Sequence, residues 1–167
     1  MTRPAMAPHP VQRLIAPADA PLLAALHRAA FTAPWDRPWS AQSFGEILAL
    51  PGAFGLIAAL PGGGAGELPE PAGFGLMLST GDEVELLLLG VLPGSRRRGI
   101  ARRLLDDLLA MAAAAGAARV LLEVAAANPA AIACYRQAGF SPCGLRRDYY
   151  APGQDALLFE RHLHNYR

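Results

Sequence analysis

An unbroken apolar run in the middle of the chain constrains the fold most strongly. Residues 85–91 read Glu-Leu-Leu-Leu-Leu-Gly-Val, the pattern of a short strand covered on both faces. The next residues, Pro93-Gly94-Ser95, have the composition of a turn. From Ile100 to Met111, apolar side chains recur every three or four residues, which predicts an amphipathic helix. The chain is therefore expected to build around this strand-turn-helix unit.

The junction between this strand and this helix has the features of an anion-binding site. The segment Arg96-x-x-Gly99-x-Ala101 precedes a helix N-terminus, where unpaired N–H groups and the helix dipole attract negative charge. Small residues at positions 99 and 101 let a ligand approach the backbone closely. A phosphate or pyrophosphate fits such a site, although the sequence matches neither a Walker loop nor the G-x-G-x-x-G fingerprint. The arginines around it are Arg96, Arg97, Arg98, Arg102 and Arg103.

This R-x-x-G-x-A segment after an apolar strand resembles the acetyl-CoA pyrophosphate loop of the GCN5-related N-acetyltransferases, the GNAT superfamily. The downstream sequence is most similar to the RimI type, the ribosomal-protein-alanine N-acetyltransferases. The resemblance is close from Glu83 to Arg161 and looser before it. The segments that carry it are Leu121-Leu-Glu-Val124, Asn128-Pro-Ala-Ala-Ile-Ala-Cys-Tyr135, Ala138-Gly-Phe140 and Arg146-Arg-Asp-Tyr-Tyr150.

Length and composition limit the other possibilities. A chain of 167 residues with 53% apolar residues suits one folded domain, residues 1–167, rather than a disordered chain. The net charge of +1 gives no general attraction to nucleic acid or membrane. Cys134 and Cys143 suit free thiols in a reducing cytosol, and the N-terminal residues have no signal-peptide pattern, so a cytoplasmic protein is expected. The histidines show no ligand spacing, so no metal is expected.

Turn and capping residues divide the chain into alternating elements of an α/β (α+β) fold. The resemblance implies a single GNAT-type domain with a central mixed, mostly antiparallel sheet of six to seven strands, about four flanking helices and splayed central strands. Residues Pro61–Pro71 are predicted to form a Gly/Pro-rich loop. Strands are expected over 11–15, 53–60, 73–79, 85–91, 119–124, 140–147 and 155–163, and helices over 17–30, 40–50, 100–115 and 128–138.

Acetyl transfer to an amine needs a base for the amine proton and an acid for the leaving thiolate. Glu123 is the first candidate base, because burial of a carboxylate in an otherwise apolar strand is costly and therefore indicates a function. The RimI type assigns the role of base to the matching glutamate. Glu85 is the second candidate, since many GNAT members place the base on the central strand. Tyr135 is the candidate acid by the same resemblance. The structural alternatives are a solvated edge-strand glutamate and a core tyrosine.

The resemblance also implies which residues contact acetyl-CoA, the expected cosubstrate. Asn128 resembles the residue that hydrogen-bonds the pantetheine arm, and it is also a good helix N-cap. The central strand contributes backbone groups in this family, and a glycine inside it is consistent with a bulge. The expected cofactor-binding residues are Leu89, Gly90, Val91, Arg96, Arg97, Arg98, Gly99, Ile100, Ala101, Arg102, Asn128 and Tyr135.

The acceptor side is expected to involve Trp35, Glu85, Tyr149 and Tyr150. The Trp35 segment resembles a Phe-Pro-Trp-Ser element of the RimI type with inserted residues, and the two tyrosines are placed in a loop over the peptide end of the groove. Core packing of Trp35 and a plain surface hairpin for the tyrosines are the alternatives.

Three functions follow from this sequence. The first is an N-α-acetyltransferase whose partner is the N-terminal peptide of a ribosomal protein, acting as a monomer or weak homodimer. The second keeps the chemistry with a small-molecule amine, such as a polyamine, an antibiotic or an amino acid. The third is a non-catalytic acyl-CoA-binding module. Direct nucleic-acid binding is not expected, because no aromatics alternate with the arginines.

Overall fold

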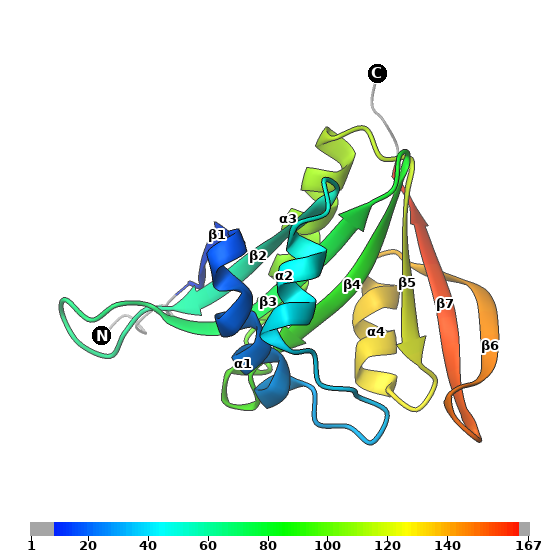
Figure 1. The fold of residues 1–167 in the computed structure, drawn as a ribbon, viewed down its shortest axis with the longest axis horizontal. Helices are drawn as coiled ribbons and strands as arrows, with labels where there is room; N and C mark the ends of the chain where they lie inside the picture. Colours follow the sequence, from blue (N-terminus) through cyan, green and yellow to red (C-terminus); the bar gives the residue numbers. More distant parts are fainter. Residues whose placement is uncertain (1–8, 164–167) are drawn as a thin grey trace, which may run out of the picture.

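The computed structural model describes residues 9–163, in which the chain forms one seven-stranded sheet with helices on both faces (Figure 1). Its strands are β1 (Val11–Leu14), β2 (Ala53–Leu60), β3 (Glu70–Ser79), β4 (Glu83–Val91), β5 (Arg119–Ala125), β6 (Ser141–Ala151) and β7 (Gln154–His162). Its helices are α1 (Ala20–Ala30), α2 (Ala41–Leu48), α3 (Ile100–Ala114) and α4 (Pro129–Gln137), with 3-10 turns η1 (Pro17–Asp19) and η2 (Pro93–Ser95).

The sheet has the order β1-β2-β3-β4-β5-β7-β6, and only β4 and β5 run parallel. The expected mixed, mostly antiparallel sheet with about four helices is therefore confirmed. In Figure 1, β4 and β5 start together at the top of the view and separate toward the bottom. Their pairing stops at Leu86 and Leu122, so the predicted splay of the central strands is confirmed.

Local sequence signals set the ends of the helices as predicted. The Ser40 hydroxyl accepts a hydrogen bond from the Ser43 N–H at 3.1 Å and caps α2. Asn128 caps α4 in the same way through the Ala131 N–H, with Pro129 at the first helical position. Gly116, in a left-handed conformation at φ 88°, follows the end of α3. No helix in the described part of the chain is long and apolar enough to cross a membrane.

Two apolar clusters lie on opposite faces of the sheet. On one face, α1 and α2 pack over the first half of the sheet, and Leu23 and Phe44 are fully buried against Phe74. On the other face, α3 and α4 pack against side chains such as Leu86 and Leu122. Helices α1 and α2 do not extend over β5, β7 and β6. On the face that these two helices cover, the β5-β7-β6 half of the sheet therefore has no helix over it and stays open beside the splay.

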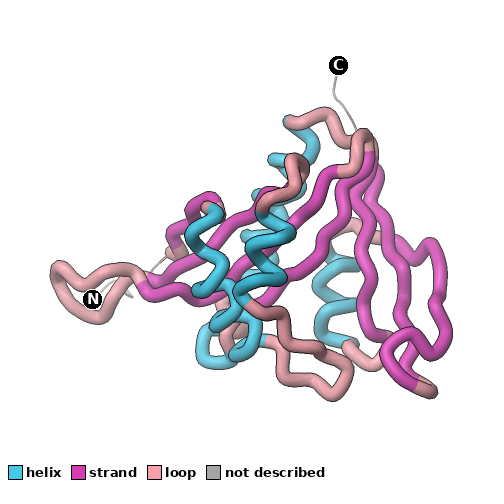
Figure 2. The backbone as a smooth tube through the Cα atoms, viewed as in Figure 1, coloured by secondary structure: helices cyan, strands magenta, loops and turns pink. Residues whose placement is uncertain are grey.

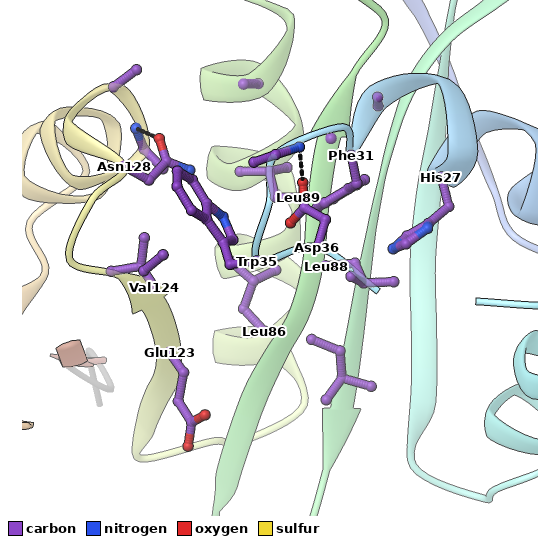
Figure 3. Close-up of a pocket in the computed structure, with 18 of the residues that line it drawn as sticks. His27, Phe31, Trp35, Asp36, Leu86, Leu88, Leu89, Glu123, Val124 and Asn128 are labelled. Atoms are coloured by element: carbon purple, nitrogen blue, oxygen red, sulfur yellow. Dashed lines mark hydrogen bonds between the residues drawn. The ribbon is translucent and has the colours of Figure 1, made fainter. Parts of the chain in front are cut away.

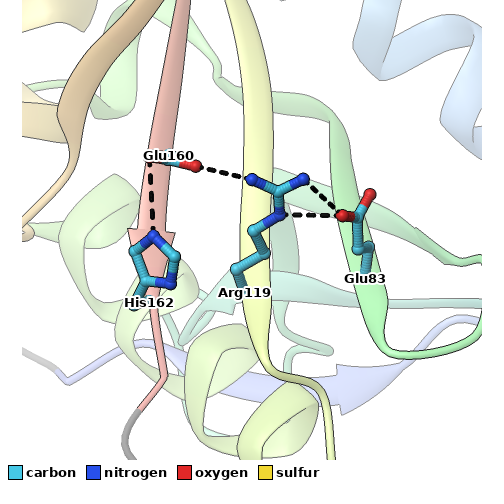
Figure 4. Close-up of polar contacts among 4 residues, drawn as sticks. All are labelled: Glu83, Arg119, Glu160 and His162. Carbon is cyan, nitrogen blue, oxygen red and sulfur yellow. Dashed lines mark hydrogen bonds and ion pairs between the residues drawn. The ribbon is translucent and has the colours of Figure 1, made fainter.

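An ion-pair network fixes the closed end of the splay (Figure 4). Arg119, at the start of β5, donates from Nε to Glu83 on β4 at 2.8 Å and from Nη1 to Glu160 on β7 at 2.9 Å. His162 lies 3.5 Å from the other oxygen of Glu160. The network therefore joins β4, β5 and β7 at the end where the strands pair, and leaves the other end free to diverge.

Two strand boundaries differ most from the prediction. Strand β3 begins at Glu70, so the Gly/Pro-rich loop is residues 61–69 rather than 61–71; it projects from the sheet in Figure 2. Pro71 enters the strand because the register shifts beside Ala59, and a bulge tolerates a residue without an N–H. Strand β6 also continues to Ala151, beyond its predicted end at residue 147.

Candidate active site

The separation of β4 and β5 opens a pocket of about 920 Å³ beside the sheet. Strand β4 has a bulge at Leu87, because Leu88 pairs with Leu76 while Leu86 pairs with Met77. Beyond Leu86 the edge of β4 that faces β5 has no strand partner. Main-chain groups along that edge are therefore available to a ligand.

Most of the predicted site residues meet at this pocket. Those that line it are Trp35, Glu85, Leu89, Gly90, Val91, Arg96, Ala101, Glu123, Asn128, Tyr135, Tyr149 and Tyr150. Five others lie next to Ala101 at the start of α3 without lining the pocket: Arg97, Arg98, Gly99, Ile100 and Arg102. Residues from both halves of the sequence therefore share one cavity.

The turn before α3 exposes a row of backbone donors. Arg97 and Gly99 both have positive φ angles, 61° and 74°, and Gly99 occupies the N-cap position without a side-chain cap. Within residues 9–163, the N–H groups of residues 97–102 have no hydrogen-bond acceptor. Successive N–H groups at such a turn and helix start can accept an anion, and this is the role that the sequence pattern predicts for the segment.

Two of the arginines serve the fold through their side chains, which the sequence did not indicate. Arg96 donates from Nε to the carbonyl oxygen of Val91 at 3.1 Å and from Nη2 to that of Ala30 at 2.9 Å. Arg102 pairs with Asp106 and donates to the Gln137 carbonyl oxygen at 2.9 Å. The exposed cations nearest the row of donors are instead Arg97 and Arg98.

Tyr135 combines a buried ring with a free hydroxyl. Its ring packs edge-to-face on Phe140 at 5.9 Å, and only 9% of the residue is exposed. Within the described chain the hydroxyl makes no hydrogen bond, yet the side chain lines the pocket. Burial raises the pKa of the phenol, so the group stays protonated and remains able to donate.

Glu123 lies on the open face of β5, within the otherwise apolar strand expected from the sequence. Its neighbours Leu122 and Val124 are buried on the α3/α4 face, and Glu123 points the other way. Its side chain is 22% exposed and forms an ion pair with Arg146 at 3.2 Å. The carboxylate therefore faces the pocket in a charged cluster rather than a dry core.

Glu85 is the second carboxylate of the pocket. It pairs with Leu121, which shares the face of Glu123, so both glutamates lie on the same side of the sheet. The Glu85 side chain reaches solvent, but nearby protein atoms partly desolvate its carboxyl. This desolvation and the charge of Glu123 raise the pKa of Glu85, while Arg146 opposes the shift.

Tyr149 and Tyr150 lie within β6 rather than in the predicted loop. The strand bulges at residues 147–150, since Arg146 pairs with Ala156 but the next pair is Ala151 with Gln154. Asp148, at φ 52°, stabilises the bulge by accepting the Gly153 N–H at 2.6 Å. Both tyrosines consequently turn toward the pocket, and the charge of Glu123 raises the pKa of Tyr149.

The segment between α1 and α2 closes the pocket on its other side (Figure 3). Trp35 reaches across the opening toward Asn128, whereas Trp39 packs in an aromatic cluster with Phe44, 5.3 Å between centroids. Core packing was the alternative for Trp35, and this side chain lines the pocket. Trp39 also lines the pocket, but it packs against the apolar cluster as well. Asp36 points toward the pocket and accepts the Ala33 N–H at 2.8 Å.

Sequence reasoning missed His27, which is 2% exposed and lines the pocket. Its ring stacks on Phe31 at 4.4 Å, and Nδ1 accepts the Trp39 N–H at 3.5 Å. Burial lowers the pKa of His27, so the neutral form is favoured. The available signal was its position one helical turn after the buried Leu23, on the apolar stripe of α1.

Comparisons with known proteins agree with this geometry. Residues 21–140 match the model of the Acetyltransferase (GNAT) family. The N-alpha-acetyltransferase RimI of Mycobacterium tuberculosis is 40% identical over 128 residues, which cover 75% of this chain and 77% of that protein. An uncharacterized protein of Mycobacterium leprae is 36% identical over 152 residues; the match covers 88% of this chain but only 39% of that protein.

Among solved structures, the fold is similar to the crystal structure of the ribosomal-protein-S18-alanine N-acetyltransferase from Escherichia coli. The TM-score is 0.79 at 26% sequence identity, and the similarity covers 91% of this chain and 92% of the other. The splayed sheet and the pocket beside it thus belong to a fold shared with a protein of known architecture.

Proposed function

The chain belongs to the acetyltransferase (GNAT) family, and we propose that it transfers an acetyl group from acetyl-CoA to the α-amine of a ribosomal protein's N-terminal alanine. One observation carries the proposal. The β4–β5 opening brings a carboxylate, Glu123, and a protonated phenol, Tyr135, to one pocket beside unpaired strand backbone. A binding module needs neither an acid nor a base, whereas amine acetylation needs both. The proposed acceptor places the reaction in the cytoplasm.

The residues present fit acetyl-CoA. Six successive N–H groups without an acceptor, residues 97–102, suit a pyrophosphate, and the exposed Arg97 and Arg98 add positive charge. The opening beyond Leu86 suits a narrow pantetheine arm, with Asn128 at its edge. When bound, acetyl-CoA supplies an acetyl group activated as a thioester.

In the proposed reaction, the residues move two protons. The ammonium proton passes to Glu123, directly or through a water molecule, with Glu85 as the alternative acceptor. The amine nitrogen then forms a bond to the acetyl carbon as the carbon–sulfur bond breaks, and the nitrogen gives up its second proton to water as the amide forms. Tyr135 gives its phenolic proton to the departing thiolate and is later reprotonated from solvent. Unpaired N–H groups of β4 beyond Leu86 are the proposed donors to the acetyl oxygen.

The acceptor is proposed to enter between the α1–α2 segment and β6. Trp35 lines one side of this approach, and Tyr149 and Tyr150 line the other. Three carboxylates, those of Asp36, Glu85 and Glu123, line the same pocket and favour a cationic amine over an anionic acceptor.

The test measures thiol release from acetyl-CoA with a peptide beginning Ala-Arg-Tyr-Phe, against polyamines, aminoglycosides and free amino acids. The wild type is compared with Glu123→Gln and Tyr135→Phe. We expect turnover of the peptide and a loss of roughly 10²-fold or more in each variant. Turnover of small amines alone would keep the chemistry and reject the ribosomal acceptor. Binding of acetyl-CoA without turnover of any amine would reject the enzyme.

A further inference from the structure

The strand register places a cation from the edge of the sheet beside the two carboxylates. Glu123 pairs with Leu158 of β7, and Leu158 pairs with Gly144 of β6. Arg146 is two residues after Gly144, so the alternation of side chains puts it on the face of Glu123. The residue opposite Arg146 on β7 is the small Ala156. The Arg146 side chain can therefore cross β7 and reach β5.

The contacts of Arg146 confirm this path. One guanidinium nitrogen, Nη2, lies 3.2 Å from Oε1 of Glu123. The guanidinium carbon also lies 5.3 Å from the ring centroid of Tyr149, within the range of a cation–π contact. The Arg146 side chain is 52% exposed, against 22% for Glu123. The arginine thus approaches from the solvent side and restrains a carboxylate that lies deeper in the pocket.

We propose that Arg146 is a positioning residue for the acid–base chemistry: it holds the Glu123 carboxylate at the opening and offsets the repulsion between Glu123 and Glu85. The proposal rests on the proposed acetyl transfer, because it assigns a role at that same site. It goes beyond the acid and base pair by bringing in a residue of the distant edge strand.

The charges around the two glutamates explain why such a cation is needed. The charged and titratable groups near Glu85 are Glu123 on β5 and Arg146 and Tyr149 on β6. Those near Glu123 are Glu85, Arg146, Tyr149 and Tyr150. Two carboxylates at one site disfavour each other's ionised form, and an opposite charge nearby reverses the effect. Arg146 lowers the pKa of Glu85 against desolvation and Glu123. Without this arginine, the pair is expected to keep a proton to higher pH and to accept the amine proton less readily.

The experiment compares pH profiles of kcat for the wild type, Arg146→Gln, Arg146→Lys and Arg147→Gln, with the best amine found for the wild type. Arg147 is the matched control, since it is the adjacent arginine, is exposed, and forms no ion pair within the described residues. We expect Arg146→Gln to move the acidic limb to higher pH, so that activity near pH 6.5 falls at least threefold more than activity near pH 8.5. Arg146→Lys restores most of the profile, and Arg147→Gln leaves it unchanged. An equal loss at every pH, or a change in KM alone, would overturn the positioning role.

A second measurement needs no turnover. The side-chain carboxyl carbons of Glu85 and Glu123 are titrated by NMR in the free protein, with Arg146→Gln beside the wild type. We expect the Glu85 titration to move to higher pH in the variant and to stay in place in Arg147→Gln. Unchanged titration in Arg146→Gln would reject the proposal, even in an active enzyme. A shift in a protein that acetylates no amine would support the charge arrangement and reject the proposed function.

Discussion

Arg96 joins two segments that are 66 residues apart: its Nη2 donates to the main-chain oxygen of Ala30 at 2.9 Å. The same guanidinium donates from Nε to Val91, the last residue of β4. The end of α1 and the end of β4 are therefore fixed relative to each other, and both border the pocket.

Replacing Arg96 with glutamine is expected to release this connection. Loss of the two hydrogen bonds predicts a decrease of about 1–2 kcal/mol in the free energy of unfolding, measured by urea denaturation. Because the α1–α2 segment borders the pocket, we also expect a higher KM for the acceptor. Arg103→Gln is the control for stability, since Arg103 is exposed on α3 and makes no side-chain hydrogen bond within residues 9–163. Equal stability of the two variants would contradict the role.

Gly90 is required by the close approach of Phe31. A Cβ at position 90 would lie 2.5 Å from Cε2 of Phe31, whose ring is held by its stack on His27. We expect Gly90→Ala to destabilise the protein by about 1–3 kcal/mol. The second change Phe31→Leu is expected to recover part of this loss. Gly94→Ala is the control, because nothing lies within 4 Å of the added Cβ. A similar Tm for Gly90→Ala, the double variant with Phe31→Leu and Gly94→Ala would argue against the clash.

Tyr135 is expected to act as a proton donor without titrating in the working range. Burial raises the pKa of its phenol above the ordinary value of about 10, so kcat should not fall on the alkaline side through loss of this proton. Tyr135→Phe is expected to lower kcat while leaving stability nearly unchanged, since the hydroxyl has no partner in the described chain. The pH profile of the wild type and the Tm of the variant test both points. A large loss of stability in the variant would indicate a structural role instead.

His27 makes stability dependent on pH. Burial lowers its pKa below the ordinary 6.5, and only Asp36 opposes the shift. Between that lowered value and 6.5 the unfolded chain binds more protons than the folded one, so stability falls as pH drops through this window. His27→Gln is expected to flatten this part of the curve, measured by urea unfolding at several pH values. His9→Gln, at an exposed position, is expected to leave the slope unchanged; a full slope without His27 would assign the effect to another group.

Trp35 is expected to move when acetyl-CoA binds. Its indole reaches across the opening proposed for the thioester arm, whereas Trp39 is held in the aromatic cluster. The chain has two tryptophans, so Trp39→Phe leaves Trp35 as the one reporter. Fluorescence of that variant is predicted to change on addition of acetyl-CoA, and fluorescence of Trp35→Phe to change little. The opposite pattern would place the ligand elsewhere.

Much of the fold was predictable because the deciding interactions are local. Ser40 and Asn128 cap their helices through N–H groups three residues away, and apolar periodicity marked the strand at 85–91 and the helix after Ile100. The wide bulge of β6 was not predictable, because it depends on how residues 147–150 fit against β7. The prediction therefore placed Tyr149 and Tyr150 in a loop.

The sequence by itself determined the strand-turn-helix unit, the helix start after Gly99 and the residue types of the expected acid and base, because these depend on neighbours within about one helical turn. Only the tertiary structure decided what surrounds them. The sheet order β5-β7-β6 brings Arg146 to Glu123, and the register of β4 and β5 puts Glu85 on the same face. Pairing between strands far apart in the sequence sets these contacts. The sequence near a charged residue does not indicate which distant residue will become its partner.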